Sequence, residues 1–138
     1  MLGSIEQVLW PDHCVAGTPG ADLHSKLRTE SAGMILRKGM NPSIDSYSAF
    51  RENDRITKTG LEGFLRSLPV DTIYLCGLAT DFCVYFSAID AVELGFNTHV
   101  VLDGCAGIDV PSGTVNDRIE SMRSSGIKIL SSDVITNE

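Results

Sequence analysis

The second half of the chain alternates between short apolar runs and longer amphipathic stretches. Short β-branched runs predict buried strands, and amphipathic stretches closed by glycine or proline predict helices. The predicted strands are 34–36, 72–76, 98–102 and 127–130, and the predicted helices are 59–68, 82–94 and 114–124. This alternation predicts parallel strands joined by right-handed crossovers, which is an α/β fold.

Two segments show neither the apolar runs typical of strands nor the spacing typical of amphipathic helices. The first thirty residues and the stretch 41–53 are broken by prolines, glycines and serines, which predicts loops. At the boundary with the first predicted helix, Thr59 and Glu62 fit a capping box. In parallel sheets, functional groups gather beyond the carboxyl ends of the strands. The candidates for chemistry are therefore Lys38 and the segments 77–83 and 103–107.

Composition narrows the class of protein. The 138 residues suit a single domain over 1–138, and 43% hydrophobic with 21% charged residues is globular composition. The formal charge of -7 argues against a nucleic-acid partner, which would need a basic face. No apolar run approaches the roughly 20 residues that span a bilayer, which argues against a membrane protein. The first fourteen residues lack a signal-peptide pattern, so we expect a cytoplasmic protein with reduced thiols.

One of the four cysteines, Cys83, occupies a position suited to chemistry. The segment 77–84 runs from a strand end into a helix start, with Thr80 or Asp81 as the expected N-cap. Free backbone N–H groups and the helix dipole there favour a thiolate and can bind an oxyanion. On position alone, the alternative stays open that Cys83 is a buried cysteine packing as a small apolar residue.

Four segments together resemble a known enzyme family. They are GLATDFCV at 77–84, WPDHCV at 10–15, RKG at 37–39 with DSYSAF at 45–50, and DGCA at 103–106. The first resembles the nucleophile motif of the isochorismatase-like cysteine hydrolases, and WPDHCV with RKG and DSYSAF resembles the nicotinamidase (pyrazinamidase) branch. The resemblance extends from Trp10 to about Val134. It implies a three-layer α/β/α fold and hydrolysis of nicotinamide to nicotinate and ammonia, a step of pyridine nucleotide salvage, through a cysteine thioester.

The resemblance also implies roles for individual residues. Cys83 would be the nucleophile and Lys38 the active-site lysine whose ammonium stabilises the thiolate. The backbone N–H groups of Ala79 and Cys83 would form the oxyanion hole, and the Leu78–Ala79 peptide would be cis. For Lys38, the alternative from the residues alone is a solvated surface lysine.

Further implied roles concern a metal and the substrate ring. His13 would be one ligand of a divalent metal, either zinc, iron or manganese. Trp10 and Tyr47 would line the pocket for a small aromatic amide by stacking. The alternatives are a surface histidine and ordinary core packing of the two aromatic rings.

The family's N-terminal segments do not occur in this sequence. The catalytic aspartate of a DxQxDF-like segment and two metal ligands of a DxH pattern are missing, together with the first two central strands. We therefore expect an N-terminally truncated hydrolase domain with bare strand edges, as a truncated form of a longer nicotinamidase. The alternatives for the strand edges are a second chain or a homo-oligomer that completes the sheet, and a different fold in which the remaining strands close up or pair across a dimer. The alternatives are another amide or carbamoyl hydrolase of the superfamily and a catalytically inactive remnant.

Overall fold

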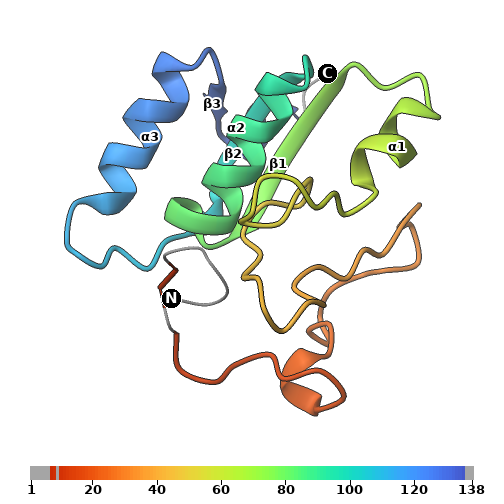
Figure 1. Ribbon diagram of the computed structural model, residues 1–138. Coiled ribbons are helices and arrows are strands. Elements are labelled where there is room, and N and C mark those ends of the chain that lie inside the picture. The colour runs from red at the N-terminus through yellow and green to blue at the C-terminus, as the bar shows by residue number, and fades with distance from the viewer. Residues whose placement is uncertain (1–6, 9, 136–138) are drawn as a thin grey trace.

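A three-stranded parallel sheet organises the chain (Figure 1). The structure is a computed structural model that describes residues 7–8 and 10–135. The strands, in sheet order, are β1 (Thr72–Leu78), β2 (Asn97–Ala106) and β3 (Lys128–Leu130). The α-helices are α1 (Leu61–Arg66), α2 (Tyr85–Glu93), α3 (Thr114–Ser124) and α4 (Ser132–Ile135). The predicted α/β class with a parallel sheet is confirmed.

The hydrophobic core lies between the sheet and two helices. Figure 1 shows α2 and α3 side by side over one face of the sheet. The buried cluster there consists of Val84, Ala88, Val100, Met122 and Ile127. A second cluster, built from Phe50, Ala91 and Phe96, joins α1 and the loop before it to the other side of α2. Both faces of α2 are therefore packed, and this helix is fixed relative to the sheet.

A register shift lies at the carboxyl end of β1. Leu75 pairs with Val100, whereas Gly77 pairs with Cys105, so β2 contributes extra residues opposite β1. Because of this pairing β2 continues to Ala106, beyond the predicted end of the strand at residue 102. Gly77 has a φ of 125°, which glycine tolerates without the steric penalty of a side chain. The irregularity directs the chain out of β1 toward the segment that carries Cys83.

The predicted strand at 34–36 is wrong. This segment is irregular, and the side chains of Met34 and Ile35 are exposed rather than buried. A buried strand needs a neighbour for its backbone hydrogen bonds, and the described residues offer this segment none. The apolar run alone carries no information about whether such a neighbour exists.

The predicted capping box at the start of α1 is also wrong. The N-cap is Gly60, with a φ of 97°, and it has no side-chain cap. Thr59 Oγ1 accepts a hydrogen bond from the N–H of Leu61 at 3.3 Å, not from that of Glu62, and it donates to the carbonyl of Ala49 at 2.6 Å. Glu62 pairs with Lys58 at 2.9 Å. The helix forms near its predicted place, but other contacts fix its first turn.

The described residues before α1, 7–8 and 10–60, form loops, part of which lie beside the carboxyl end of β1 and the start of α2 (Figure 1). One short 3-10 turn, Pro19–Ala21, interrupts them. An isolated antiparallel bridge between Arg51 and Lys58 closes a hairpin beside α2. Within the part of the chain that the structure describes, no helix is long and apolar enough to span a bilayer.

Candidate active site

Cys83 lies in a π-helical turn, Thr80–Val84, that joins β1 to α2. The carbonyl of Ala79 accepts hydrogen bonds from the N–H groups of Phe82 and Val84, each at 3.1 Å. Cys83 is therefore in the first helical turn as predicted, although the turn is wider than an α-helical one. The expected N-cap at Thr80 or Asp81 is wrong, because Ala79 occupies that position without a side-chain cap.

The peptide bond between Leu78 and Ala79 is cis, which confirms the expectation from the family resemblance. It places Ala79 directly before the cysteine turn, so Ala79 and Cys83 bracket one short segment. Their proposed part in an oxyanion hole stays a prediction.

The Lys38 ammonium lies against the sulfur of Cys83. The distance from Lys38 Nζ to Cys83 Sγ is 3.6 Å, and both side chains are partly buried. Lys38 Nζ also donates to the carbonyl of Ser46, which holds the lysine side chain in place. A cation at this distance stabilises negative charge that develops on the sulfur. The structure thus brings together the two residues that sequence analysis placed at the centre of the chemistry.

Aromatic rings gather beside the cysteine turn. Trp10 Nε1 donates to the hydroxyl of Tyr47 at 3.1 Å, so the two predicted ring-binding residues are in contact. Phe82 packs edge-on against both, with ring centroids 5.0 Å from Trp10 and 5.4 Å from Tyr47. Phe86 stacks on Tyr47 at 5.5 Å. This aromatic cluster, Trp10, Tyr47, Phe82 and Phe86, presents apolar surface suited to a flat ring.

Sequence analysis missed Phe82 and Phe86 as members of this site. Both lie within the predicted helix 82–94, and neither is among the predicted site residues. Their positions one residue before and three residues after Cys83 place them on the helix start, and this spacing is the signal that could have identified them.

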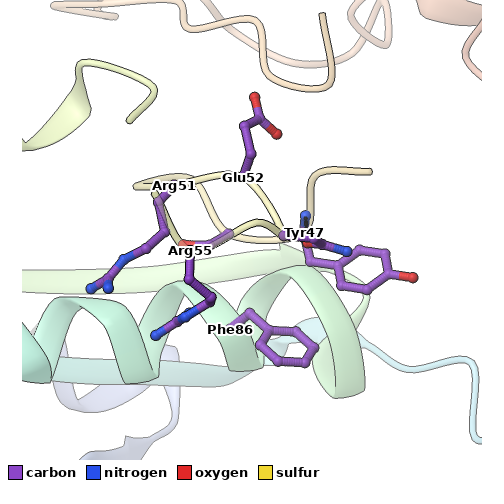
Figure 2. Close-up of a pocket in the computed structure, with 7 residues that line it drawn as sticks. Tyr47, Arg51, Glu52, Arg55 and Phe86 are labelled. Atoms are coloured by element: carbon purple, nitrogen blue, oxygen red, sulfur yellow. Dashed lines mark hydrogen bonds between the residues drawn. The ribbon is translucent and has the colours of Figure 1, made fainter. Parts of the chain in front are cut away.

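Tyr47 also borders a cavity of about 210 Å³ on the outer side of α2. Figure 2 shows Tyr47 and Phe86 at one end of this cavity and Arg51 and Arg55 at the other. Burial raises the pKa of the Tyr47 phenol, the hydrogen bond from Trp10 opposes this shift, and the negative charge of Asp45 adds to it. Tyr47 is therefore a neutral hydrogen-bonding group at neutral pH.

Asp81 anchors the cysteine turn to a distant loop. Its side chain is only 1% exposed. Backbone N–H groups of Ile108 and Asp109 donate to the carboxylate at 3.0 and 2.9 Å, and Thr114 Oγ1 donates at 3.2 Å. Burial alone would raise the pKa of Asp81, but these hydrogen bonds outweigh it and lower the pKa below its ordinary value. Asp81, which was expected to be a helix N-cap, instead ties the cysteine turn to the loop before α3.

The remaining thiols differ from Cys83 in their surroundings. All four cysteines are free, as expected for reduced thiols, and Cys14 and Cys76 are exposed. Burial raises the pKa of the Cys105 thiol, whose sulfur donates to the carbonyl of Val101 at 3.2 Å. Cys105 is thus held as a neutral thiol, whereas Cys83 faces an ammonium group.

His13 stands apart from this arrangement. Its side chain is exposed, and Nδ1 lies 2.7 Å from the carbonyl of Pro11. Within 7–8 and 10–135 there is no group of three or more His, Cys, Asp or Glu side chains that could hold a metal ion. A catalytic metal usually has about three protein ligands. The described residues alone therefore do not fit one.

These features define an α/β protein whose cysteine sits at a strand-to-helix turn against a lysine ammonium. Residues 2–134 match the profile described as the isochorismatase domain, and the chain belongs to the isochorismatase family. The nicotinamidase of Acinetobacter baylyi is 49% identical over 91% of this chain. The match covers 58% of that relative, so this chain spans little more than half of its length.

Solved structures agree with this assignment. A nicotinamidase/pyrazinamidase from Acinetobacter baumanii superimposes with a TM-score of 0.90 at 46% identity, covering 94% of this chain and 62% of the other. A pyrazinamidase of Pyrococcus horikoshii, solved in complex with zinc, gives a TM-score of 0.75 at 34% identity. That match covers 89% of this chain and 63% of the other. The fold class is therefore that of the isochorismatase-like hydrolases.

Proposed function

We propose that this chain carries the nucleophile and the aromatic pocket of a nicotinamidase-like amidohydrolase. The observation that carries the proposal is the contact of Lys38 Nζ with Cys83 Sγ at 3.6 Å, beside the aromatic cluster. The similarity to nicotinamidases supports the choice of nicotinamide as substrate. Another amide or carbamoyl hydrolase is the less favoured alternative, because the 49% identical relative is a nicotinamidase.

The reaction follows from the positions of these groups. The Cys83 thiolate, stabilised by Lys38, attacks the carboxamide carbon and forms a C–S bond. Backbone N–H groups of Ala79 and Cys83 are the proposed donors to the developing oxyanion. The C–N bond then breaks, the nitrogen takes up the proton that the Cys83 thiol gave up and leaves as ammonia, and a thioester remains. Water hydrolyses the thioester to the carboxylic acid and restores the thiol.

The aromatic cluster is proposed to orient the substrate ring. Trp10 and Phe82 meet edge-on at 5.0 Å, and the Trp10–Tyr47 hydrogen bond fixes both side chains. Held rigidly, these rings select a planar aromatic amide and keep its carboxamide near the sulfur. Tyr47 is neutral because its pKa is raised, so it adds no charge to the aromatic cluster.

His13 is proposed as one ligand of a divalent metal, whose further ligands lie outside the described residues. Nδ1 contacts the Pro11 carbonyl, and this contact, with Nδ1 protonated, leaves Nε2 as the coordinating atom. The zinc in the Pyrococcus horikoshii pyrazinamidase supports a divalent metal of this kind. No step of the reaction above passes through it.

We further propose that a polypeptide segment outside residues 1–138, whether of this protein, of another copy or of another chain, completes the sheet at β1. Among the described residues β1 pairs only with β2, so its other side is an edge. Tyr74 and Leu78 on β1 are 46% and 73% exposed, which is unusual for a parallel strand. The added segment would also supply the carboxylate that the family resemblance assigns to proton transfer. Residues 1–138 would then form one domain with that segment.

The direct test is ammonia release from nicotinamide by the purified protein. We expect the Cys83→Ala variant to lose at least about 10³-fold in rate, since no other thiol can take its place. Cys14→Ala is the matched control, because Cys14 is an exposed cysteine of the adjoining loop region. Equal rates for the wild type and Cys83→Ala would overturn the proposal.

A further inference from the structure

One side of α2 holds the loop 45–55, named here the docking loop. Ser87 Oγ accepts a hydrogen bond from the backbone N–H of Ala49 at 2.9 Å. One helical turn further along, Asp90 pairs with Arg55 Nη1 at 2.6 Å and with Arg51 Nε at 3.3 Å. Figure 2 shows both arginine side chains reaching from the loop to the helix. The loop is therefore attached to the same helix that begins with the cysteine turn.

The attachment at Asp90 is buried. The side chain of Asp90 is 0% exposed, whereas Glu93, which binds the outer ends of both arginines, is 50% exposed. A buried carboxylate is tolerated only when cations compensate it, and removing one partner leaves an uncompensated charge. An ion pair at the exposed end contributes little. The inner pairs to Asp90 therefore dominate the attachment.

Backbone strain in the docking loop agrees with a tight attachment. Arg55 has a φ of 64°, in the left-handed region that residues with a side chain rarely adopt. Such a conformation persists where surrounding contacts fix it. The Arg55 guanidinium binds Asp90 and Glu93, and its backbone N–H donates to the carbonyl of Glu52 at 3.0 Å.

The docking loop also carries groups of the candidate active site. The carbonyl of Ser46 accepts the hydrogen bond that holds Lys38 Nζ. The backbone N–H of Tyr47 donates to Asn53 Oδ1 at 3.1 Å, and the N–H of Asn53 donates to the carbonyl of Asp45 at 2.9 Å. These hydrogen bonds join the first residues of the docking loop to Asn53 near its end. A displacement of Asn53 therefore also displaces the Ser46 carbonyl, which holds Lys38.

We propose that Asp90, assisted by Ser87, is a positioning residue that sets the Lys38 ammonium against the Cys83 sulfur. Asp90 touches neither group; it fixes the docking loop on α2, and the Ser46 carbonyl on that loop fixes Lys38. The positions of both the Cys83 sulfur and the Lys38 ammonium are thus fixed by contacts to α2. The inference rests on the proposed reactivity of Cys83 and does not depend on which substrate the protein takes.

The test measures alkylation of Cys83 by iodoacetamide, resolved from the other cysteines by peptide mass spectrometry. Relative to wild type at about pH 7, we expect Asp90→Asn to slow alkylation roughly tenfold, the size expected for one lost charge-assisted contact. Glu93→Gln is the matched control at the exposed end of the same network, and we expect its rate within about twofold of wild type. An Asp90→Asn rate equal to that of the control would overturn the proposal.

A double variant separates positioning from a general loss of structure. If Asp90 acts through Lys38, then Lys38→Met combined with Asp90→Asn alkylates within about twofold of Lys38→Met alone. If the double variant instead slows alkylation by the product of the two single-variant factors, Asp90 acts independently of Lys38. This result would assign Asp90 a purely structural role and overturn the proposal. Ammonia release is a separate readout: its absence together with the expected alkylation pattern would contradict the proposed function alone.

Ser87→Ala provides a second variant of the same attachment, in case Asp90→Asn does not fold. It removes the 2.9 Å hydrogen bond to the Ala49 N–H without burying an unpaired charge. We expect roughly threefold slower alkylation of Cys83, and no change at the exposed Cys14. An unchanged Cys83 rate in Ser87→Ala would contradict the inference.

Discussion

The regions before and after residue 60 differ in how they are held. From Leu61 onward, helices and strands alternate and pack around buried apolar side chains. Before it, the described chain is loop apart from one 3-10 turn and one isolated bridge, and many of its side chains are exposed. These loops are held at particular points by hydrogen bonds and ion pairs to the regular region, such as those to Ser87 and Asp90.

The candidate active site lies where the two regions meet. The regular region contributes Cys83 on a rigid strand-to-helix turn, and the loop region contributes Lys38, Trp10 and Tyr47. This division is common in proteins, because a scaffold fixes geometry while loops carry variable functional groups. It implies that substitutions of buried side chains change stability, whereas substitutions of exposed side chains in the loops have little effect on stability.

The largest effect on stability is expected from Met122→Ala in α3. Met122 is 0% exposed in the core between sheet and helices, so truncation removes apolar contacts and leaves a cavity. We expect a loss of about 2–5 kcal/mol in the free energy of unfolding, measured by urea denaturation. Met40→Ala is the matched control, because Met40 is 67% exposed in the loop region. Comparable losses of unfolding free energy for the two variants would contradict the expected difference in stability between the two regions.

An intermediate effect is expected from Asp81→Asn at the junction. The carboxylate accepts three hydrogen bonds, and an amide oxygen replaces it less well, so we expect a loss of about 1–3 kcal/mol near neutral pH. Asp117 on the exposed side of α3 provides the control variant, Asp117→Asn, for which little change is expected.

The pH dependence of the same variant gives an independent check. Folding lowers the pKa of Asp81 below its ordinary value of 3.8, so its contribution is present above that pH and is lost as the pH falls through the folded-state value. The wild type should therefore lose stability on acidification more steeply than Asp81→Asn. Parallel curves of unfolding free energy against pH for the two proteins would show that Asp81 makes no such contribution.

The smallest effect is expected from Ile35→Ser. Ile35 is exposed in the irregular segment 34–36, so a polar residue there should change the free energy of unfolding by no more than about 0.5 kcal/mol. A loss of about 2 kcal/mol or more in urea denaturation would show that the segment is buried after all.

The regular region was largely predictable, because its contacts follow local periodicity. The helix 114–124 was predicted to the residue. The extension of β2 to Ala106 was not, because it depends on pairing with Gly77, almost thirty residues earlier in the chain. The strand predicted at 34–36 failed for a related reason: an apolar run does not reveal whether a pairing partner is present.

The site was predictable only in part. Motif resemblance identified Cys83 and Lys38, and the structure brings them together. Asp81 was expected to cap its own helix, yet its hydrogen-bond donors lie 27 or more residues away and leave no local signal. Phe86 has the spacing of a core residue, so its stacking on Tyr47 emerged only from the folded arrangement.

The most direct test of this account is the rate of Cys83 alkylation by iodoacetamide at about pH 7 in the wild type and in Lys38→Met. Lys26→Met, which removes an exposed lysine of the loop region, is the control and should follow the wild type. If the Lys38 ammonium stabilises negative charge on the sulfur across the 3.6 Å contact, Cys83 of Lys38→Met reacts at least roughly tenfold more slowly. Equal rates for Lys38→Met and the wild type would contradict the account.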